Sequence, residues 1–219
     1  MDRECVDIDR KSNEHIDMFP FSHCKAPGCH SFAAAGSGYC YHHLSPDKKK
    51  ALLDSVMDNL RLRGRLTDVS LANAEIRGLR AKDGCRISGC NFSFSVFEDC
   101  EFTGGLIVSS FFDYCFFRNC TFSSMDIRYS VFAGSTFIES SIHDSTVIHN
   151  NFTGIDALGS SFSGNDFYFS SFSLSRLVDT DLEDCNLKRT NFRGSITRGV
   201  SLKYSNPEEA FFRNEEPYL

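Results

Sequence analysis

The sequence has 219 residues, which is enough for one or two compact domains, and its hydrophobic content of 41% excludes a disordered chain. A formal net charge of −6 excludes a protein that is polycationic as a whole, although a local basic patch would be compatible with it. No run of about 18 apolar residues occurs, and the first residues, MDRECVDIDRKSNEH, are acidic and polar. The sequence therefore predicts neither a membrane span nor a signal peptide, and we expect a cytoplasmic protein.

A cluster of metal-ligand residues follows a polar N-terminal tail, residues 1–19. Within residues 20–44, Cys24, Cys29, Cys40 and His43 have the spacing C-x4-C-x10-C-x2-H, and His42 is an alternative fourth ligand. Three thiolates and an imidazole suit tetrahedral Zn²⁺, and a closed set of four ligands predicts a structural zinc site. The segment resembles a treble-clef or zinc-knuckle finger. Similar fingers occur in many nucleic-acid-associated bacterial and phage proteins, which leaves direct nucleic-acid binding open.

Residues 45–61 are predicted to form a capping helix. Ser45 is a suitable N-cap, and Pro46 occupies the first helical position. Leu52, Leu53, Val56 and Leu60 form an apolar stripe that can cover the first turn of the repeats that follow.

From Ile87 onward a large apolar residue returns every five positions, and a small residue stands two positions before most of them. The exceptions at the small position are Met125, Asn150, Ile155, Asn165 and Val200. A helix would smear a five-residue period around its axis, and a flat strand would place successive apolar residues on opposite faces. We therefore predict three extended residues followed by a two-residue corner.

The columns of the repeat indicate how many sides each coil has, because residues one coil apart should share a character. A step of twenty residues produces a column made only of phenylalanine. Its members are Phe92, Phe112, Phe132, Phe152, Phe172 and Phe192. Four sides per coil follow.

The segments CNFSF SVFED CEFTG and TDLED CNLKR TNFRG resemble the A-(D/N)-L-x-x pattern of the pentapeptide-repeat family. The resemblance implies a mainly β fold, a right-handed quadrilateral β-helix over residues 62–205. The first repeats, at Leu66, Leu71 and Ile76, are one residue out of step with the later ones. One extra residue should therefore bulge out near RGLRAKDGC, residues 77–85, either as a surface loop or as a binding loop.

Six further cysteines occupy the small inward position and are predicted to be buried thiols. They are Cys85, Cys90, Cys100, Cys115, Cys120 and Cys185. Cys100 and Cys120 lie one coil apart, and we expect them to remain unbonded.

The C-terminal segment, residues 206–219, is predicted to contain a second capping helix that starts at Asn206 and Pro207. It carries Phe211 and Phe212, which either cover the last coil or pair with a second copy. Members of the family are often dimers through this end, so the resemblance implies a C-terminal homodimer as the second alternative.

Several outward positions carry aromatic residues that the fold does not need, and these predict a surface for a protein partner. They are Phe94, Phe111, Tyr114, Phe116, Tyr129, Tyr168 and Phe169. No catalytic set is evident, since His143 and Asp144 are corner neighbours without a nucleophile, and we expect no enzymatic activity.

Between Glu98 and Asp184 there are 13 acidic residues against three arginines, a local net charge of −10. Pentapeptide proteins of the quinolone-resistance (Qnr) type use an acidic rod to imitate DNA and engage type II topoisomerases. The acidic midsection is similar to such a rod, so a gyrase-directed DNA mimic is the alternative function. This chain departs from that type in its basic ends and its N-terminal finger.

Overall fold

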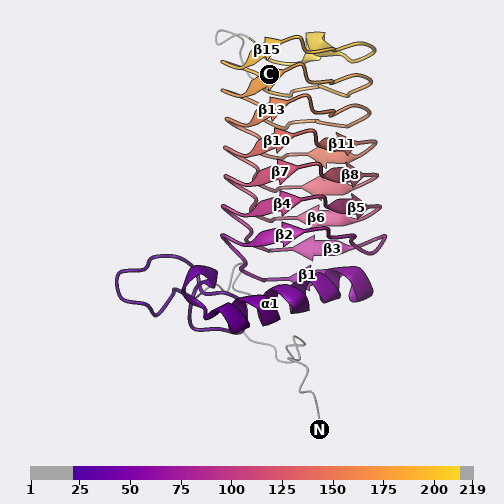
Figure 1. The fold of residues 1–219 in the computed structure, drawn as a ribbon. Coiled ribbons are helices and arrows are strands. Elements are labelled where there is room, and N and C mark those ends of the chain that lie inside the picture. The colour runs from indigo at the N-terminus through magenta and orange to yellow at the C-terminus, as the bar shows by residue number, and fades with distance from the viewer. Residues whose placement is uncertain (1–21, 213–219) are drawn as a thin grey trace, which may run out of the picture.

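The computed structural model describes residues 22–212, in which a stack of short strands rises from a single α-helix at its base (Figure 1). The predicted tail at 1–19 and the residues after Phe212 lie outside this range. Each coil has four sides, and successive coils are joined by parallel pairing. We call the four sides faces A, B, C and D, in the order in which the chain visits them from Ser70 onward.

Face A has no named strand and is held by isolated parallel bridges along one column of residues. The column is Ser70, Asn91, Phe111, Val131, Asn151, Ser171, Asn191 and Phe211. Face B is a seven-stranded sheet in the order β15-β14-β13-β10-β7-β4-β2. Its strands are β2 (Glu75–Arg77), β4 (Val96–Glu98), β7 (Phe116–Arg118), β10 (Thr136–Ile138), β13 (Asp156–Leu158), β14 (Arg176–Val178) and β15 (Ile196–Arg198).

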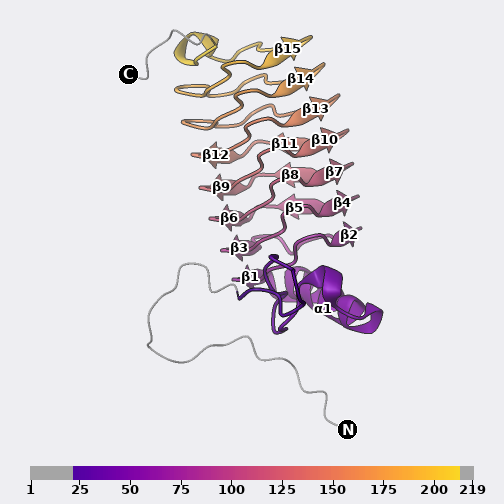
Figure 2. The same ribbon diagram turned by 90° about the vertical axis from the view of Figure 1, so that its left-hand side faces the viewer.

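Faces C and D carry the remaining strands. Face C is a three-stranded sheet of β5 (Glu101–Thr103), β8 (Thr121–Ser123) and β11 (Ser141–His143). Face D is a five-stranded sheet of β1 (Arg65–Thr67), β3 (Arg86–Ser88), β6 (Leu106–Val108), β9 (Asp126–Arg128) and β12 (Thr146–Ile148). Figure 2 shows the strands of face D one above another, with β1 at the foot.

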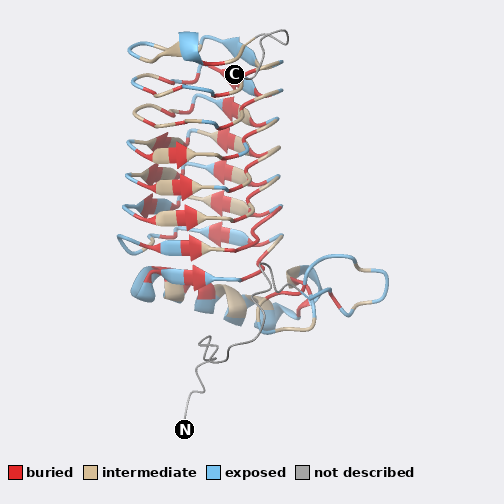
Figure 3. Ribbon diagram, turned by 180° about the vertical axis from the view of Figure 1, so that it is seen from behind, coloured by how far each residue is buried: buried red, intermediate tan, exposed pale blue. Residues whose placement is uncertain are grey.

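The predicted twenty-residue step is confirmed. Phe97 pairs with Phe117, and Phe117 pairs with Phe137. Every strand from β1 to β14 buries its middle residue and turns its first residue outward, whereas all three residues of β15 are exposed. Buried and more exposed residues therefore alternate around the coils below β15 (Figure 3). The corners recur every five residues, so four sides make one coil of twenty residues. This step places the members of the phenylalanine column one above another.

The predicted one-residue bulge is also present. Leu66 pairs with Ile87 and Ile76 pairs with Phe97, a step of 21 residues, whereas Ile87 pairs with Ile107 at the usual 20. The extra residue falls between Arg80, which bridges Glu101, and Arg86, which pairs with Leu106. The Lys82 N–H in this bulge donates to the Leu60 carbonyl oxygen at 2.9 Å. The bulge therefore anchors the cap to the solenoid.

The helix α1 (Pro46–Asp58) continues into one π-type turn, η2 (Asn59–Arg63), and ends at Gly64. Gly64 has a φ of 66°, a left-handed conformation that glycine adopts without steric cost. Val56, Met57 and Leu60 are buried in the same apolar cluster as the first coil. The helix therefore closes the lower end of the core.

The C-terminal end differs from the prediction. In place of a capping helix, the described part of 206–219 contains one three-residue 3-10 turn, η3 (Pro207–Glu209). The chain then returns to the solenoid, because Phe211 bridges Asn191 and the Phe212 ring stacks on Phe192 with centroids 5.0 Å apart. These contacts repeat the geometry of a coil, and so the helix does not continue.

Inside the stack, the small inward residues complete the hydrogen bonding of each corner. The Cys115 N–H donates to the Ser135 hydroxyl at 2.9 Å, and that hydroxyl donates to the Phe112 carbonyl at 2.6 Å. The Asn150 side-chain amide also joins two coils, because it accepts from the Ser130 N–H at 2.9 Å and donates to the Ile127 carbonyl at 2.8 Å. Buried backbone groups are thereby satisfied.

The six inward cysteines are free and buried. Burial raises the pKa of the Cys85 and Cys185 thiols to about 11, so both remain neutral thiols at physiological pH. No α-helix in the described range is both long and apolar enough to cross a bilayer.

The replacement Phe132→Ala should lower the free energy of unfolding by about 3 to 5 kcal/mol, because it opens a cavity in the middle of the stack. The Phe132 ring is fully buried, and its centroid lies 5.0 Å from that of Phe112 and 4.9 Å from that of Phe152. Urea denaturation measures the change. Phe94→Ala is the matched control, since this side chain is 56% exposed, and its loss should be about 1 kcal/mol at most. A loss below about 1 kcal/mol at Phe132 would contradict the assigned column.

Candidate functional site

The four predicted metal ligands come from two tight turns below the solenoid. His23 and Phe32 form an antiparallel bridge, and the Cys29 N–H donates to the Ala26 carbonyl at 3.1 Å across the Pro27-Gly28 turn. This hairpin presents Cys24 and Cys29. Cys40 immediately precedes the 3-10 turn η1 (Tyr41–His43), and the His43 N–H donates to the Cys40 carbonyl at 2.9 Å.

The structure brings these four side chains together, with their ligand atoms all within 4.8 Å of one another. The Cys29 and Cys40 sulfurs are 3.8 Å apart, and His43 Nδ1 lies 3.4 Å from Cys24 Sγ and 3.3 Å from Cys40 Sγ. Four ligands at tetrahedral bond lengths would be separated by about 3.5 to 3.8 Å. The donor set and its spacing therefore fit a metal ion. His42 lies outside the set, which distinguishes it from His43, although both side chains are exposed.

The thiol environment here differs from that of the core cysteines. Burial raises the pKa of Cys24, but hydrogen bonds from the Cys40 and Ala26 backbones and from His43 outweigh it and lower the pKa to about 6. For Cys40 burial dominates and raises the pKa. A thiol that is already largely ionised at neutral pH is a better metal ligand than the neutral thiols of the core.

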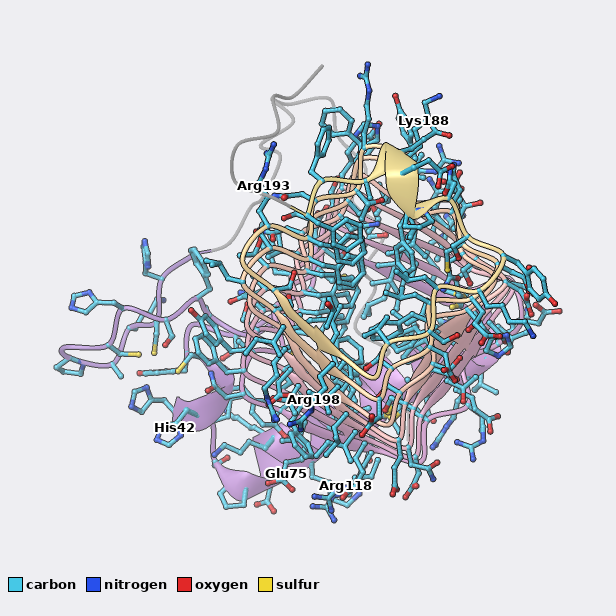
Figure 4. The ribbon with its side chains drawn as sticks, turned by 90° about the horizontal axis from the view of Figure 1, so that it is seen from above. His42, Glu75, Arg118, Lys188, Arg193 and Arg198 are labelled. Carbon is cyan, nitrogen blue, oxygen red and sulfur yellow. The ribbon has the colours of Figure 1, made fainter. Side chains whose placement is uncertain are left out.

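The finger is attached to the lower end of face A. The Ala35 N–H donates to the carbonyl oxygen of Ser70, the first residue of the face A column, at 3.3 Å. Tyr41 and Ala35 also pack against the solenoid core, and burial raises the pKa of Tyr41. Seen along the axis, the finger with His42 projects beyond the side of the stack (Figure 4).

The predicted partner residues lie on and around face A. At the corner between faces A and B, the Phe94 ring stacks on Tyr114 with centroids 5.2 Å apart and planes 7° apart. The Tyr114 ring covers Gly134, where an added Cβ would lie 2.6 Å from a ring carbon. Phe111 lies on face A itself, and Phe116 lies on face B; both are half-buried.

The other corner of face A, which it shares with face D, carries a second column of rings. Tyr129 stacks on His149 at 5.4 Å, and His149 contacts Phe169 at 5.2 Å. The Arg189 guanidinium follows, 6.0 Å from the Phe169 ring centre, and Tyr168 meets His149 edge-on at 5.8 Å. Sequence reasoning missed His149, although its position twenty residues from both Tyr129 and Phe169 could have revealed it.

The acidic residues are distributed differently from the aromatic ones. Five of them pair with arginine: Glu75 with Arg77, Glu98 with Arg77 and Arg118, Glu101 with Arg80, Asp126 with Arg128, and Asp156 with Arg176. Within residues 22–212, six acids without an ion pair lie on face C and its corners: Asp99, Glu139, Asp179, Asp181, Glu183 and Asp184. In a four-sided coil face C is opposite face A, so this acidic group and the aromatic rings occupy opposite sides.

Comparisons with known proteins identify the repeat. Residues 175–214 match the family model described as pentapeptide repeats, in eight copies. No curated protein matches the sequence at a significant level.

Solved structures that are similar to this chain include the following three. HetL, a pentapeptide-repeat protein involved in heterocyst differentiation regulation in the cyanobacterium Nostoc, is 14% identical over 70% of this chain and 91% of its own, with a TM-score of 0.35. QnrB1, a plasmid-mediated fluoroquinolone resistance protein, is 20% identical over 63% of this chain and 79% of its own, with a TM-score of 0.25. A glycosyl hydrolase of uncertain assignment from Parabacteroides merdae is 8% identical over 75% of this chain and 86% of its own, with a TM-score of 0.26.

These scores are too low to transfer a function. The assignment rests on the matched repeats and on the coils before them, which have the same five-residue construction and twenty-residue step. Residues 175–214 therefore match pentapeptide repeats, and the described coils before them form a four-sided β-helix with the same twenty-residue step.

Proposed function

We propose that the protein is a non-enzymatic binding or scaffold protein that presents face A and its two aromatic corners to a protein partner. The observation that carries the proposal is the gathering of exposed rings around one side of a rigid stack. Phe94, Tyr114, Tyr129 and Phe169 are each between 46% and 62% exposed.

The stacking of these rings favours binding in two ways. Each ring is held by a neighbour one coil away, so little side-chain entropy is lost when a partner docks. The half-buried Phe111 and Phe116 lie beside these rings on the same side of the stack. Aromatic residues are enriched at protein interfaces. The finger is attached at the foot of the same face, through the bond from the Ala35 N–H to the Ser70 carbonyl.

The metal that we propose for the finger is a structural Zn²⁺ held by Cys24, Cys29, Cys40 and His43. Three thiolates and one imidazole in a closed set favour zinc over harder cations. We place the protein in the cytoplasm, where its thiols would stay reduced. Direct contact of the finger with nucleic acid is compatible with this proposal, as is a homodimer through the end that carries Phe211 and Phe212, which sedimentation would detect as twice the mass of the chain.

A second candidate function is a DNA mimic that modulates or protects DNA gyrase. The unpaired carboxylates of face C and its corners favour it, because they form a negative surface on one side of a rod. The ion pairs of Glu98, Glu101, Asp126 and Asp156 weaken it, since they neutralise part of the acidic midsection.

Metal analysis of the purified full chain should give one zinc ion per molecule. Cys40→Ser and His43→Ala should lose most of it, because each removes one of four ligands, whereas His42→Ala should retain it. Mass spectrometry of the metal content provides the measurement. If chelator-treated protein were to keep native hydrogen-exchange protection over residues 22–44, the zinc proposal would be wrong.

Substitution of two half-buried aromatic residues should weaken binding of the partner to face A. The double variant Phe111→Ser, Phe116→Ser should bind the partner at least about tenfold more weakly, because interface aromatics commonly contribute about 2 kcal/mol or more each. Quantitative affinity capture from the native host, followed by titration with the recovered protein, measures the loss. Tyr204→Ser, at a 74% exposed position on a distant corner, should bind normally. Equal capture by both variants would count against face A.

The gyrase alternative predicts that micromolar protein inhibits or protects gyrase in a supercoiling assay. The triple variant Asp179→Asn, Asp181→Asn, Asp184→Asn should weaken the effect severalfold because it removes charge from face C, while Asp166→Asn on face D should not. The absence of any effect from the unaltered protein would exclude the mimic.

A further inference from the structure

Charge is divided along the axis of the molecule. Residues 22–88 contain 11 lysines and arginines against six acidic residues, a net charge of +5. Residues 89–212 contain eight basic residues against 15 acidic ones, a net charge of −7. The end that carries the finger and the capping helix is therefore basic, and the rest of the rod is acidic.

Four exposed cations gather where the capping helix enters face D. Arg63 ends η2, Arg65 begins β1, Arg86 begins β3, and Lys82 lies in the bulge. Arg65 and Arg86 are direct register partners on the paired strands β1 and β3. The Arg86 N–H donates to the Gly64 carbonyl at 2.6 Å, and a Cβ on Gly64 would lie 3.4 Å from Lys82 Cβ. Figure 2 shows β1 and β3 at the foot of this wall, directly above α1.

The pairing of Arg65 with Arg86 is an exception to the charge pattern of the solenoid. Elsewhere in the described coils, charged register partners have opposite signs: Arg77 with Glu98, Glu98 with Arg118, and Asp156 with Arg176. Like charges directly opposite on neighbouring strands are destabilising. Within residues 22–212, none of Arg63, Arg65, Lys82 and Arg86 has an ion pair with an acidic side chain. The nearby Asp83 instead directs its carboxylate towards Gly104 on the next coil.

The 21-residue step contributes directly to this cluster. The extra residue lies in the bulge, and the bond from the Lys82 N–H to the Leu60 carbonyl holds it beside the end of the helix. A regular 20-residue coil would have no such residue at this corner. The feature that breaks the repeat thus also supplies the fourth cation.

We propose that Arg63, Arg65, Lys82 and Arg86 form a binding site for the phosphate backbone of nucleic acid. Neighbouring strands are about 4.8 Å apart, so the cations are closely spaced. A nucleic-acid backbone offers negative charges at comparably short intervals. The guanidinium group also matches phosphate oxygens in a two-pronged geometry.

The remainder of the rod determines how nucleic acid approaches. Its net charge of −7 repels a polyanion from the upper coils and directs it to the basic end. Contacts to phosphate carry little sequence information, so the site should bind without strong sequence preference. This proposal is independent of the protein partner of face A and of metal binding by the finger.

Fluorescence anisotropy with a labelled 20-base-pair DNA duplex and its single strand tests the site in the full-length, metal-loaded protein. We expect binding at low salt, with a slope of log K against log salt of roughly −3 to −4 for the duplex, as four phosphate contacts require. The double variant Arg65→Gln, Arg86→Gln should bind about tenfold or more weakly, with the slope reduced in size by about 2. The matched control Arg198→Gln, Lys203→Gln removes the same charge from exposed positions at the far end and should change affinity less than about twofold.

Thermal unfolding shows whether the variants fold, and relief of the like-charge pair should leave Arg65→Gln, Arg86→Gln at least as stable as the unaltered protein. Equal losses in the two double variants would overturn the site, because bulk charge would then explain binding. A failure of the unaltered protein to bind either nucleic acid at 50 mM salt would overturn it as well. Binding to anionic phosphatidylserine vesicles or to polyglutamate, without nucleic acid, would assign the cluster to a different partner and refute the proposal.

Discussion

The molecule depends on one constraint, the exact superposition of each coil on the next at a step of twenty residues. Two interactions enforce it. Phenylalanine rings stack along the interior with centroids near 5 Å, as in the pair Phe132 and Phe152 at 4.9 Å. Beside them, small polar side chains connect consecutive coils, as Ser135 does by accepting from the Cys115 N–H and donating to the Phe112 carbonyl. A shift of one residue would turn the rings outward and leave those backbone groups unpaired.

This constraint explains which parts of the structure could be predicted from sequence. The five-residue period is repeated many times, so the sequence predicts the inward column and the corner positions. The one-residue bulge is predicted because the apolar residues before it are one position out of step with those after it. The metal cluster could be predicted because three cysteines and a histidine at short spacing have few other uses. The hydrogen-bonding role of Asn150 and Asn165 was harder to predict from the sequence. Both depart from the small-residue pattern, yet their amides make the same coil-to-coil bonds as serine.

Other features depend on contacts that a period does not encode. The choice between His42 and His43 is made by the 3-10 turn, which directs only the second ring towards the thiols. The C-terminal turn stops after three residues because Phe211 and Phe212 find partners on the preceding coil. The net charge of a segment likewise does not reveal which acids are paired, since that depends on the neighbour twenty or twenty-one residues away.

The same superposition arranges the surface residues in columns, so each outward side chain lies next to the side chains at the same position in the coils above and below it. Opposite charges on register partners neutralise each other, as in Arg77, Glu98 and Arg118, and aromatic neighbours stack, as in Tyr129, His149 and Phe169. Such columns stabilise themselves. A column that contains like charges does not, and Arg65 with Arg86 is such a column. Because charged partners elsewhere in the described coils have opposite signs, the like-charge pair is the departure from the pattern on which we base the proposed phosphate-binding site.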